Sequence, residues 1–368
     1  MKKKGKTQAQ GSFAPSWVRR EGKRNAGVTE MILITGGAGF IGSHLVETIL
    51  GQGEKVRILD DFSTGKRENL EEALGIALPA LGESKGSVRI LPLSSRADLF
   101  VGDISDIEIC REACQDVSFI FHQAALGSVP RSVEDPLTSH QVNATGTLNL
   151  LQAAKEAKVK RLIYASSSSV YGDLTKNSKE TVPKKESATL HPQSPYAATK
   201  MMGEVYCRIF SSLYGLETVS LRYFNVFGPR QDPQSIYAAV VPKFMQAELE
   251  GVPAVIYGDG EQSRDFTFVS NVVEANLLAM KAPGISGRVF NIACGQKISV
   301  NELLSLLQGI SGIRIPARFE PARSGDIRHS LSSIAQAQAH LGYEPRVDFQ
   351  NGLAVTWEWF RKNFLNRA

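Results

Sequence analysis

Three glycines that follow a short apolar run constrain the fold of this chain more than any other feature. The apolar residues 31–34 are followed by Gly36, Gly39 and Gly42, and a helical pattern starts at about Ser43. Glycine is needed where a backbone turns tightly, approaches a phosphate or packs closely, because a Cβ would obstruct each of these. A strand, a turn and a helix N-terminus in this order present free backbone N–H groups to an anion. The pattern predicts a dinucleotide-binding turn, although a plain tight turn would share its glycines.

An acid at the end of the next strand favours the dinucleotide. Residues 56–59 read as a second strand that ends at Asp60, about 20 residues after the glycine turn, as a ribose-binding acid requires. A carboxylate there accepts hydrogen bonds from the ribose hydroxyls and repels a 2′-phosphate, so NAD is favoured over NADP. Arg57 and Lys66 lie nearby in the sequence, and a cation that reached the ribose would weaken this preference.

The net charge of +5 comes from the first thirty residues. They hold eight Lys or Arg and two Glu, and without them the chain's 42 bases and 37 acids become 34 and 35. The rest is close to neutral, which gives no indication of nucleic-acid binding. Residues 1–30 are polar and lack the apolar stretch of a secretory signal, so we expect a basic, disordered tail rather than a binding arm.

Membrane insertion and metal binding find no support in the sequence. No stretch of 18 apolar residues occurs, so we expect no membrane span. The four cysteines, Cys110, Cys114, Cys207 and Cys294, have neither C-x-x-C nor zinc spacing. Cys110 and Cys114, four apart in an expected helix, are expected to be buried small side chains rather than a redox pair, and we expect a cytoplasmic protein that has no metal site.

Strand and helix patterns alternate through the first two thirds of the chain. Strands are expected at 98–103, 118–122, 161–165 and 218–222, and helices at 104–115, 136–157 and 195–214. This alternation predicts an α/β fold, a Rossmann-type doubly wound parallel sheet. Residues 71–96 have no clear period and are expected to form a long surface connection.

A second unit is expected after residue 227. From residue 228 to 368 the elements become shorter and are punctuated by Gly and Pro, and a helix is expected at 352–364. We therefore predict a dinucleotide-binding domain at 31–227, to which a segment near 264–292 also belongs. Residues 228–368 would form a smaller C-terminal α/β substrate domain.

Ser167, Tyr196 and Lys200 form the candidate catalytic group. Ser194 and Pro195 are a strong helix start, so Tyr196 and Lys200 lie four apart on one helix face. An ammonium and a helix N-terminus beside the phenol should lower the pKa of Tyr196 and make it a general base. The spacing alone also fits an exposed tyrosine beside a solvated lysine. The serine run 166–169, at the carboxyl end of an expected strand where ligands bind, favours the catalytic interpretation.

With these motifs in place, nearly all of residues 31–365 resembles the extended short-chain dehydrogenase/reductases that act on nucleotide sugars. The matching segments are 35–42, Asp60, 102–104, 122–125, Ser167 with Tyr171, Tyr196 with Lys200, 221–225, 264–266 and 323–326. The resemblance implies an NAD site made of Gly36, Gly39, Phe40, Ile41, Gly42, Asp60, Asp103, Ile104, Ala124 and Lys200.

The resemblance also implies a UDP-sugar site, carried largely by the C-terminal part. Its residues would be Ser128, Ser167, Ser168, Ser169, Tyr196, Asn225, Arg264, Arg323, Asp326 and Ser330. Guanidinium groups pair well with diphosphate oxygens, and a carboxylate accepts hydrogen bonds from ribose hydroxyls. Without the family resemblance, we would interpret Arg264, Arg323 and Asp326 as members of surface ion pairs. His122 is expected to be structural.

The residues after Ser167 favour one reaction of this family. Dehydratases resembling this fold place Asp-Glu after the catalytic hydroxyl residue, and decarboxylases carry Glu two residues before the following tyrosine. This chain has Ser168 and Ser169 there, so the resemblance implies reversible oxidation at C4 of the sugar, which is 4-epimerisation.

Residues 122–132 and 224–242 are particularly similar to bacterial UDP-N-acetylglucosamine 4-epimerases of polysaccharide synthesis. Ser330 occupies a position where glucose-only epimerases have a bulky tyrosine, so it would leave room for an N-acetyl group. A UDP-glucose or UDP-uronate 4-epimerase remains an alternative, with Arg131 as the candidate cation for a uronate. A non-catalytic NAD-sensing regulator is an alternative of another class.

The resemblance finally implies a homodimer through a bundle of the helices near 136–157 and 195–214. Leu148, Leu151, Val205 and Ile209 are the apolar positions that support it.

Overall fold

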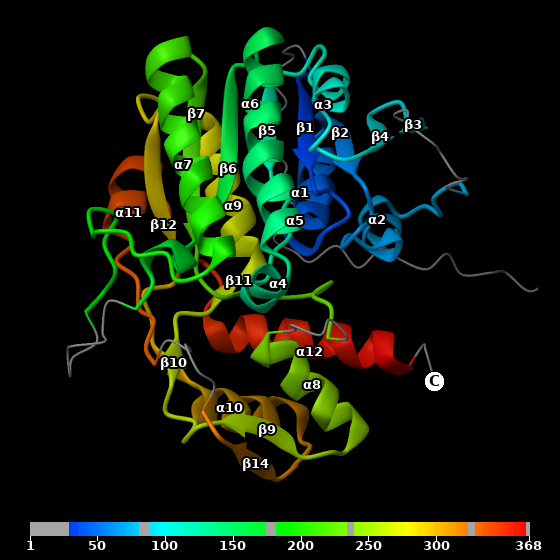
Figure 1. Ribbon diagram of the computed structural model, residues 1–368. Helices are drawn as coiled ribbons and strands as arrows, with labels where there is room; N and C mark the ends of the chain where they lie inside the picture. Colours follow the sequence, from blue (N-terminus) through cyan, green and yellow to red (C-terminus); the bar gives the residue numbers. More distant parts are fainter. Residues whose placement is uncertain (1–28, 81–88, 174–181, 234–238, 323–327, 366–368) are drawn as a thin grey trace, which may run out of the picture.

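A single large sheet organises the molecule (Figure 1). The computed structural model describes residues 29–80, 89–173, 182–233, 239–322 and 328–365, and within these ranges eight strands form this sheet in the order β12-β7-β6-β5-β1-β2-β4-β3. Neighbouring strands are parallel except β3 and β4. The strands are β1 (Met31–Thr35), β2 (Lys55–Asp60), β3 (Arg89–Ser94), β4 (Ala97–Val101), β5 (Phe119–His122), β6 (Arg161–Ser167), β7 (Glu217–Tyr223) and β12 (Arg288–Ile292). The predicted doubly wound α/β fold is confirmed.

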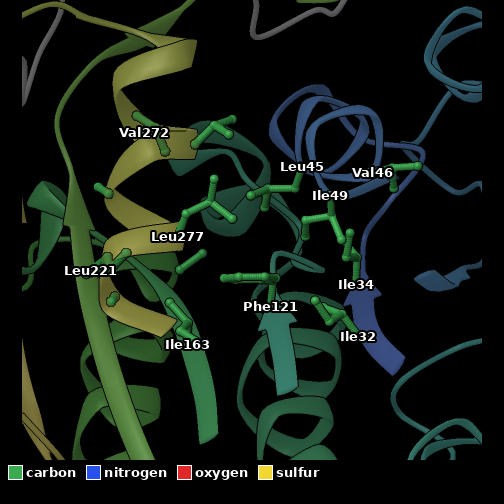
Figure 2. Packing of buried hydrophobic residues seen from close by; sticks show 14 of the residues in the cluster. Ile32, Ile34, Leu45, Val46, Ile49, Phe121, Ile163, Leu221, Val272 and Leu277 are labelled. Carbon is green, nitrogen blue, oxygen red and sulfur yellow. The ribbon is translucent and has the colours of Figure 1, made fainter. Parts of the chain in front are cut away.

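Helices cover both faces of the sheet, as its apolar strands require. One face carries α1 (Phe40–Gly51), α9 (Val269–Lys281) and α11 (Ala335–Leu341), and Figure 2 shows Leu45 and Leu277 of these helices over Phe121 of β5. The other face carries α3 (Ile107–Ala113), α6 (Gly146–Glu156) and α7 (Pro195–Tyr214). Each large apolar side chain removed from water contributes about 1.5–3 kcal/mol, so these two layers hold the helices that carry the site.

Helix α7 lies unusually close to the sheet. Ser194 caps its N-terminus by accepting a hydrogen bond from the Ala197 N–H at 3.1 Å, and Pro195 occupies the first turn, as predicted. Further along, a Cβ at Gly203 would collide with the ring of Tyr164 on β6. Tyr164 is fully buried and has nowhere to move, so only glycine lets α7 approach β6 this closely.

The helix expected at 136–157 is interrupted. It consists of α5 (Pro136–His140), a π-helical turn (Gln141–Thr145) and α6. In that turn the Asn143 side chain accepts a hydrogen bond from the Leu126 N–H at 2.8 Å and donates one to the Leu126 carbonyl at 3.2 Å. The irregular turn thus fastens the loop that follows β5, a common reason for a π bulge near a functional site.

Two expectations for the first unit were wrong. Residues 71–96 are not only a surface connection, because α2 (Arg67–Leu74) extends into them and β3 adds an antiparallel edge strand. The sequence pattern did not predict β3, because this strand is half-exposed and its pairing register with β4 shifts after Pro92. Leu151 does not belong to a surface for a second chain, because it is completely buried against the sheet.

A smaller unit lies at one end of the sheet (Figure 1). It contains α8 (Val240–Glu250), β9 (Ala254–Tyr257), α10 (Val300–Ser311), β14 (Ala317–Glu320) and α12 (Phe349–Leu365), around a core with Phe244, Leu303 and Trp357. Helix α12 corresponds to the helix expected at 352–364. The chain crosses between the units more than once, since α9, β12 and α11 pack with the sheet.

Short pairings connect the two units. Strand β8 (Val226–Phe227) pairs with β11 (Thr267–Phe268), and β10 (Ser263–Arg264) pairs with β13 (Ile298–Ser299). The cysteines Cys110, Cys114 and Cys207 are buried, and burial raises the pKa of the Cys207 thiol to about 12. Among the described helices none has the length and hydropathy to cross a membrane. The described side chains also contain no cluster of three or more His, Cys, Asp or Glu arranged to bind a metal ion.

Candidate active site

The glycine turn after β1 builds one wall of the site. Gly36 has φ +69°, and a Cβ on it would lie 2.6 Å from the Ala124 backbone nitrogen. A Cβ on Gly42 would collide with the Gly36 carbonyl. Gly39 caps α1 without any side-chain hydrogen bond, so no side chain satisfies the first N–H groups of this helix. The turn therefore offers free N–H donors at a position where only glycine fits.

A cleft of about 380 Å³ opens beside this turn, at the point between β1 and β5 where the strand order reverses. All the residues predicted to bind the cofactor line this one cleft: Gly36, Gly39, Phe40, Ile41, Gly42, Asp60, Asp103, Ile104, Ala124 and Lys200. Tyr196, Ser128 and Arg131 line it too. The Ser128 hydroxyl also caps helix α4 (Val129–Glu134) by accepting from the Arg131 N–H at 3.1 Å.

Asp60 is held rigidly at the end of β2. Its two oxygens accept hydrogen bonds from the Ala38 and Phe62 N–H groups, both at 2.8 Å. Burial raises the pKa of the Asp60 carboxyl to about 6, against the effect of these two hydrogen bonds. The carboxylate keeps further lone pairs for hydroxyl donors.

The two cations near Asp60 in the sequence, Arg57 and Lys66, form their contacts with other groups. Arg57 donates to the carbonyls of Ala113 at 3.0 Å and of Gln115, and Lys66 pairs with Asp232 at 2.8 Å. Neither lines the cleft. A 2′-phosphate would therefore meet the Asp60 carboxylate without a cation from these two residues, which supports NAD over NADP.

Ser167, Tyr196 and Lys200 meet at the carboxyl end of β6. The Ser167 hydroxyl lies close enough to the Tyr196 phenol to lower its pKa through hydrogen bonding. The Lys200 ammonium is buried, donates to the Ala165 carbonyl at 2.8 Å and lies 5.9 Å from the centre of the Tyr196 ring. Burial lowers the pKa of Lys200 to about 8.

The expected lowering of the Tyr196 pKa was wrong for the protein without a bound nucleotide. Burial raises the pKa of the Tyr196 phenol, and the hydrogen bond from Ser167 opposes this. The physical reason is that the Lys200 ammonium is directed at a carbonyl rather than at the phenol oxygen, so desolvation is the larger effect. A positive charge bound in the cleft would act in the lowering direction.

The remaining serines differ from the expectation. Ser167, Ser168 and Ser169 do not line the cleft, whereas Ser166 does. The Ser167 hydroxyl accepts a hydrogen bond from the Ser169 N–H at 3.1 Å, which starts the short 3-10 helix η2 (Ser168–Tyr171). The Ser169 hydroxyl is buried and has no partner among the described residues, so it has capacity for a ligand.

Sequence reasoning missed Gln123 and Tyr223, which also line the cleft. The Gln123 amide donates to the Tyr223 hydroxyl at 3.1 Å and to the Asn276 side chain at 3.3 Å. Both residues stand at carboxyl ends of parallel strands, a signal that was available from the sequence. His122, in contrast, behaves as expected: it bonds Thr35 at 2.7 Å, and burial lowers its pKa to about 3.

Of the residues expected to hold a UDP group, Asn225 and Arg264 are described by the structure, and both lie outside the lining of this cleft. Arg264 donates to the carbonyls of Ser263 at 2.9 Å and Arg328 at 3.3 Å, and the Ser330 N–H donates to the same Ser263 carbonyl at 3.0 Å. Asn225 donates to the Asp265 carbonyl at 3.4 Å. The structure thus brings Asn225, Arg264 and Ser330 into one neighbourhood. Arg323 and Asp326 lie outside the described residues.

Asp265 holds this neighbourhood together. Its buried carboxylate accepts from the N–H groups of Cys294 at 3.0 Å, Gly295 at 3.1 Å and Ser332 at 3.1 Å. Burial raises the pKa of the Asp265 carboxyl to about 6, against these hydrogen bonds. Two backbone segments, residues 294–295 and the segment at Ser332, therefore converge on one side chain next to Arg264.

Known proteins match this chain over most of its length. A UDP-glucose 4-epimerase of Mycolicibacterium smegmatis is 38% identical over 330 residues, which are 89% of this chain and 98% of that protein. The solved UDP-N-acetylglucosamine 4-epimerase from Methanobrevibacter ruminantium M1, in complex with UDP-N-acetylmuramic acid, is 38% identical, with 91% of this chain and 99% of that chain covered and a TM-score of 0.80. The UDP-glucuronic acid 4-epimerase from Bacillus cereus, in complex with UDP-glucuronic acid and NAD, is 30% identical, with coverages of 90% and 99% and a TM-score of 0.79.

The glycine turn, the uncapped helix α1 and Asp60 define a Rossmann-type NAD enzyme. Residues 32–293 match the model of the NAD dependent epimerase/dehydratase family. The chain belongs to this family, within the extended short-chain dehydrogenase/reductases that it was predicted to resemble. It is an isomerase, and its cofactor is NAD.

The buried ammonium of Lys200 predicts a pH-dependent gain in stability when it is removed. Because its folded-state pKa of about 8 is below the ordinary value of 10.5, the charged form destabilises the folded state at neutral pH, and this penalty disappears as pH rises from about 8 to about 10.5. The free energy of unfolding of nucleotide-free Lys200→Met is therefore compared with that of wild type at each pH. The advantage of the variant should be larger at pH 7 than above pH 10.5 by up to about 3 kcal/mol. Denaturant unfolding at a series of pH values measures this. The exposed Lys281→Met is the control, and a Lys200→Met difference that is constant with pH would contradict the prediction.

Proposed function

We propose that this protein is a UDP-N-acetylglucosamine 4-epimerase that interconverts UDP-GlcNAc and UDP-GalNAc for polysaccharide precursor synthesis in the cytoplasm. The observation that carries the proposal is that Tyr196 and Lys200 line the same cleft as the glycine turn, with Ser167 beside the Tyr196 phenol. Ser168 and Ser169 provide no carboxylate for elimination or decarboxylation, which favours epimerisation. The similarity to the Methanobrevibacter enzyme supports the N-acetylated sugar, at the same 38% identity as the UDP-glucose 4-epimerase of Mycolicibacterium smegmatis.

Each side chain of the site has its own role in the proposed reaction. NAD, when bound, supplies the acceptor and donor of hydride for C4 of the sugar. Tyr196 takes the proton of the 4-hydroxyl, the Ser167 hydroxyl holds the same oxygen, and the Lys200 ammonium stabilises the phenolate. The UDP group, held by Asn225 and Arg264 with Arg323 and Asp326, would tether the 4-keto sugar while it turns over in the pocket. Ser128 and Ser169 would contact the sugar.

A UDP-uronate 4-epimerase is the second candidate. Arg131 lines the cleft and supplies a cation that a sugar carboxylate would need. The Bacillus cereus enzyme shows that the same scaffold binds UDP-glucuronic acid. A UDP-glucose 4-epimerase is supported by the relative from Mycolicibacterium smegmatis.

Incubation with a panel of UDP-sugars tests the proposal. Purified protein, with no added NAD, should invert C4 of UDP-GlcNAc and UDP-GalNAc, as followed by NMR, and denatured protein should release NAD(H). Tyr196→Phe should lose about 10²–10⁴-fold in rate while UDP binding persists, because only the proton acceptor is removed. No activity even with added NAD would defeat the proposal. A Tyr196→Phe rate above about a tenth of wild type would show that another group is the base.

Ser330 is proposed to leave room for the N-acetyl group. Ser330→Tyr should fill this space and cost about 1–3 kcal/mol, a loss of about 5–150-fold in kcat/KM for UDP-GlcNAc with little change for UDP-glucose. Steady-state kinetics with both sugars measure the selectivity. Equal losses for both would mean damage to the fold or to the UDP site, and no loss for either would place Ser330 outside the pocket.

We also propose a homodimer through α4, α5 and α7. Val133 and Leu137 are 63% and 82% exposed on α4 and α5, which pack against α7, where Val205 is 38% exposed. Sedimentation at micromolar concentration should show a dimer, and Leu137→Glu should yield monomers because it places a charge in the apolar contact. Phe319→Glu, at an exposed apolar residue on β14, is the matched control and should remain dimeric. A monomeric wild type would refute the dimer.

A further inference from the structure

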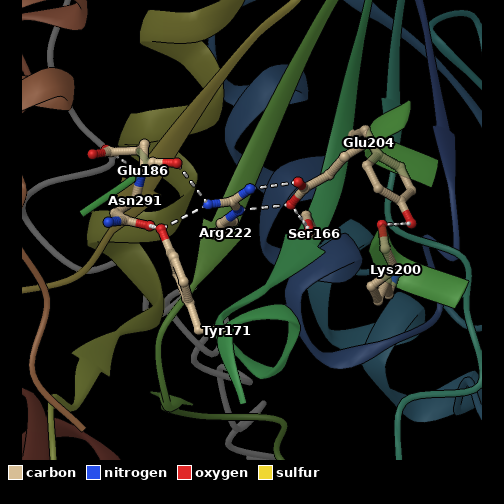
Figure 3. Close-up of polar contacts among 8 residues, drawn as sticks. Ser166, Tyr171, Glu186, Lys200, Glu204, Arg222 and Asn291 are labelled. Atoms are coloured by element: carbon tan, nitrogen blue, oxygen red, sulfur yellow. Dashed lines mark hydrogen bonds and ion pairs between the residues drawn. The ribbon is translucent and has the colours of Figure 1, made fainter. Parts of the chain in front are cut away.

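A buried ion pair beside the catalytic group takes no part in the chemistry proposed above. Glu204 lies one helical turn after Lys200 on α7, and Arg222 lies on β7 three residues before Asn225. Arg222 donates to both carboxylate oxygens of Glu204, at 2.8 and 2.7 Å, and the two side chains are only 4% and 6% exposed (Figure 3). The Ser166 hydroxyl donates to the same carboxylate. The strand residue next to Ser167 is thus bound to the helix that carries Lys200.

The other side of Arg222 extends the network to β12 and to the segment before α11. Its remaining Nη donates to the Tyr171 hydroxyl at 2.7 Å, and this hydroxyl donates to the Asn291 side chain at 2.7 Å (Figure 3). Asn291 in turn donates to the carbonyls of Lys184 at 3.0 Å and Ser333 at 3.2 Å. Burial raises the pKa of Tyr171 to about 12, so its hydroxyl stays protonated at neutral pH.

Stability does not account for a charge pair at this depth. Removing two charges from water is costly, and apolar side chains of similar volume stabilise a core equally well or better. The ion pair instead fixes the orientation of its neighbours, because a guanidinium that is hydrogen-bonded on both edges allows one arrangement of them. Those neighbours, Ser166 and Tyr171, flank the turn that begins at Ser167.

We infer that the Glu204–Arg222–Tyr171 network is the positioning element that holds the Ser167 hydroxyl against the Tyr196 phenol and ties this contact to residues 330–333. The inference rests on the proposed function. None of the three lines the cleft, so they are positioning residues and not catalytic ones. Ser333 accepts from Asn291, and its N–H donates to the Lys184 carbonyl at 2.9 Å, which joins the segment after Ser330 to the same network.

The opposite end of the same two strands offers a matched control. Ser166 pairs with Arg222 in the register of β6 and β7, and Arg161 pairs with Glu217 five residues earlier. Arg161 also forms an ion pair with Glu217, and it donates to the Ala279 and Ala282 carbonyls at the end of α9. The control is thus also an Arg–Glu pair at a β6–β7 register position, but it lies at the edge far from the serine turn, and its Glu217 side chain is 48% exposed.

Tyr171→Phe is the decisive variant, since it removes one hydroxyl and keeps the buried ring. It should lower kcat about 10–100-fold with a smaller change in KM, because displacement of a catalytic hydroxyl has effects of this size. The hydrogen bond from Ser167 lowers the pKa of Tyr196, so its loosening should move the acidic limb of the kcat/KM profile to higher pH. Glu204→Gln should cause the same shift, whereas Glu217→Gln should leave kcat and the profile unchanged.

A substrate-free readout separates this inference from the proposed function. The part of the tyrosinate absorbance that is present in wild type and absent from Tyr196→Phe reports the ionisation of Tyr196 directly. Tyr171→Phe should raise the pH at the midpoint of that titration. If the wild type epimerises no UDP-sugar but this midpoint shifts, the proposed function fails and the positioning role stands. Folded Tyr171→Phe with at least half the wild-type kcat and an unmoved midpoint would overturn the inference. An equal loss of kcat in Glu217→Gln would do so too, because any ion pair on these strands would then have the same effect.

Discussion

The close approach of the Gly42 backbone to the Gly36 carbonyl determines where the rest of the site can lie. It sets the N-terminus of α1 directly over the end of β1, at the place where the strand order reverses. A side chain at either position would push the helix off the sheet, and the first N–H groups of α1 would no longer face the cleft. Because β1 has neighbours on both sides, β2 and β5, the same contact fixes the distance between Asp60 and Ala124 on opposite sides of the turn.

The charged groups of the site are buried, and burial disfavours their ionised forms. Burial raises the pKa values of the Asp60 and Asp265 carboxyls and lowers that of Lys200, so each ionised group is destabilised in the nucleotide-free protein. Fixed backbone partners compensate in part: N–H groups for the two acids, and a carbonyl for the lysine. A bound molecule with complementary groups would supply the rest. The fold thus gives up stability in order to keep these charges oriented before any ligand arrives.

The parts of this fold that the sequence predicted depend on local rules. Apolar strand runs, the Ser194 cap with Pro195, and the glycine turn each act within a few residues, and the sheet and the members of the NAD cleft followed from them. The failures depend on partners distant in the chain. The Lys200 ammonium faces the Ala165 carbonyl, which no spacing reveals, and so the Tyr196 pKa was predicted in the wrong direction. The places of Gln123 and Tyr223 at strand ends could be read from the sequence, but the hydrogen bond between their side chains depends on β5 and β7 ending at one edge of the sheet.

A reaction that holds the substrate from one unit and moves its proton from another needs a stiff connection between the two. Apolar packing is poorly suited to this, because it tolerates sliding, whereas directional hydrogen bonds to buried charges allow one register. Two sets of such bonds occur here: Asp265 binds two backbone segments, 294–295 and the one at Ser332, near Arg264, and Arg222 joins the serine turn to Asn291 on β12. Neither set uses the side chain of Arg131, Ser168 or Ser330 in the bonds described above. Relatives of 30–38% identity whose names give different UDP-sugars share this scaffold, as expected where a fold hosts different sites.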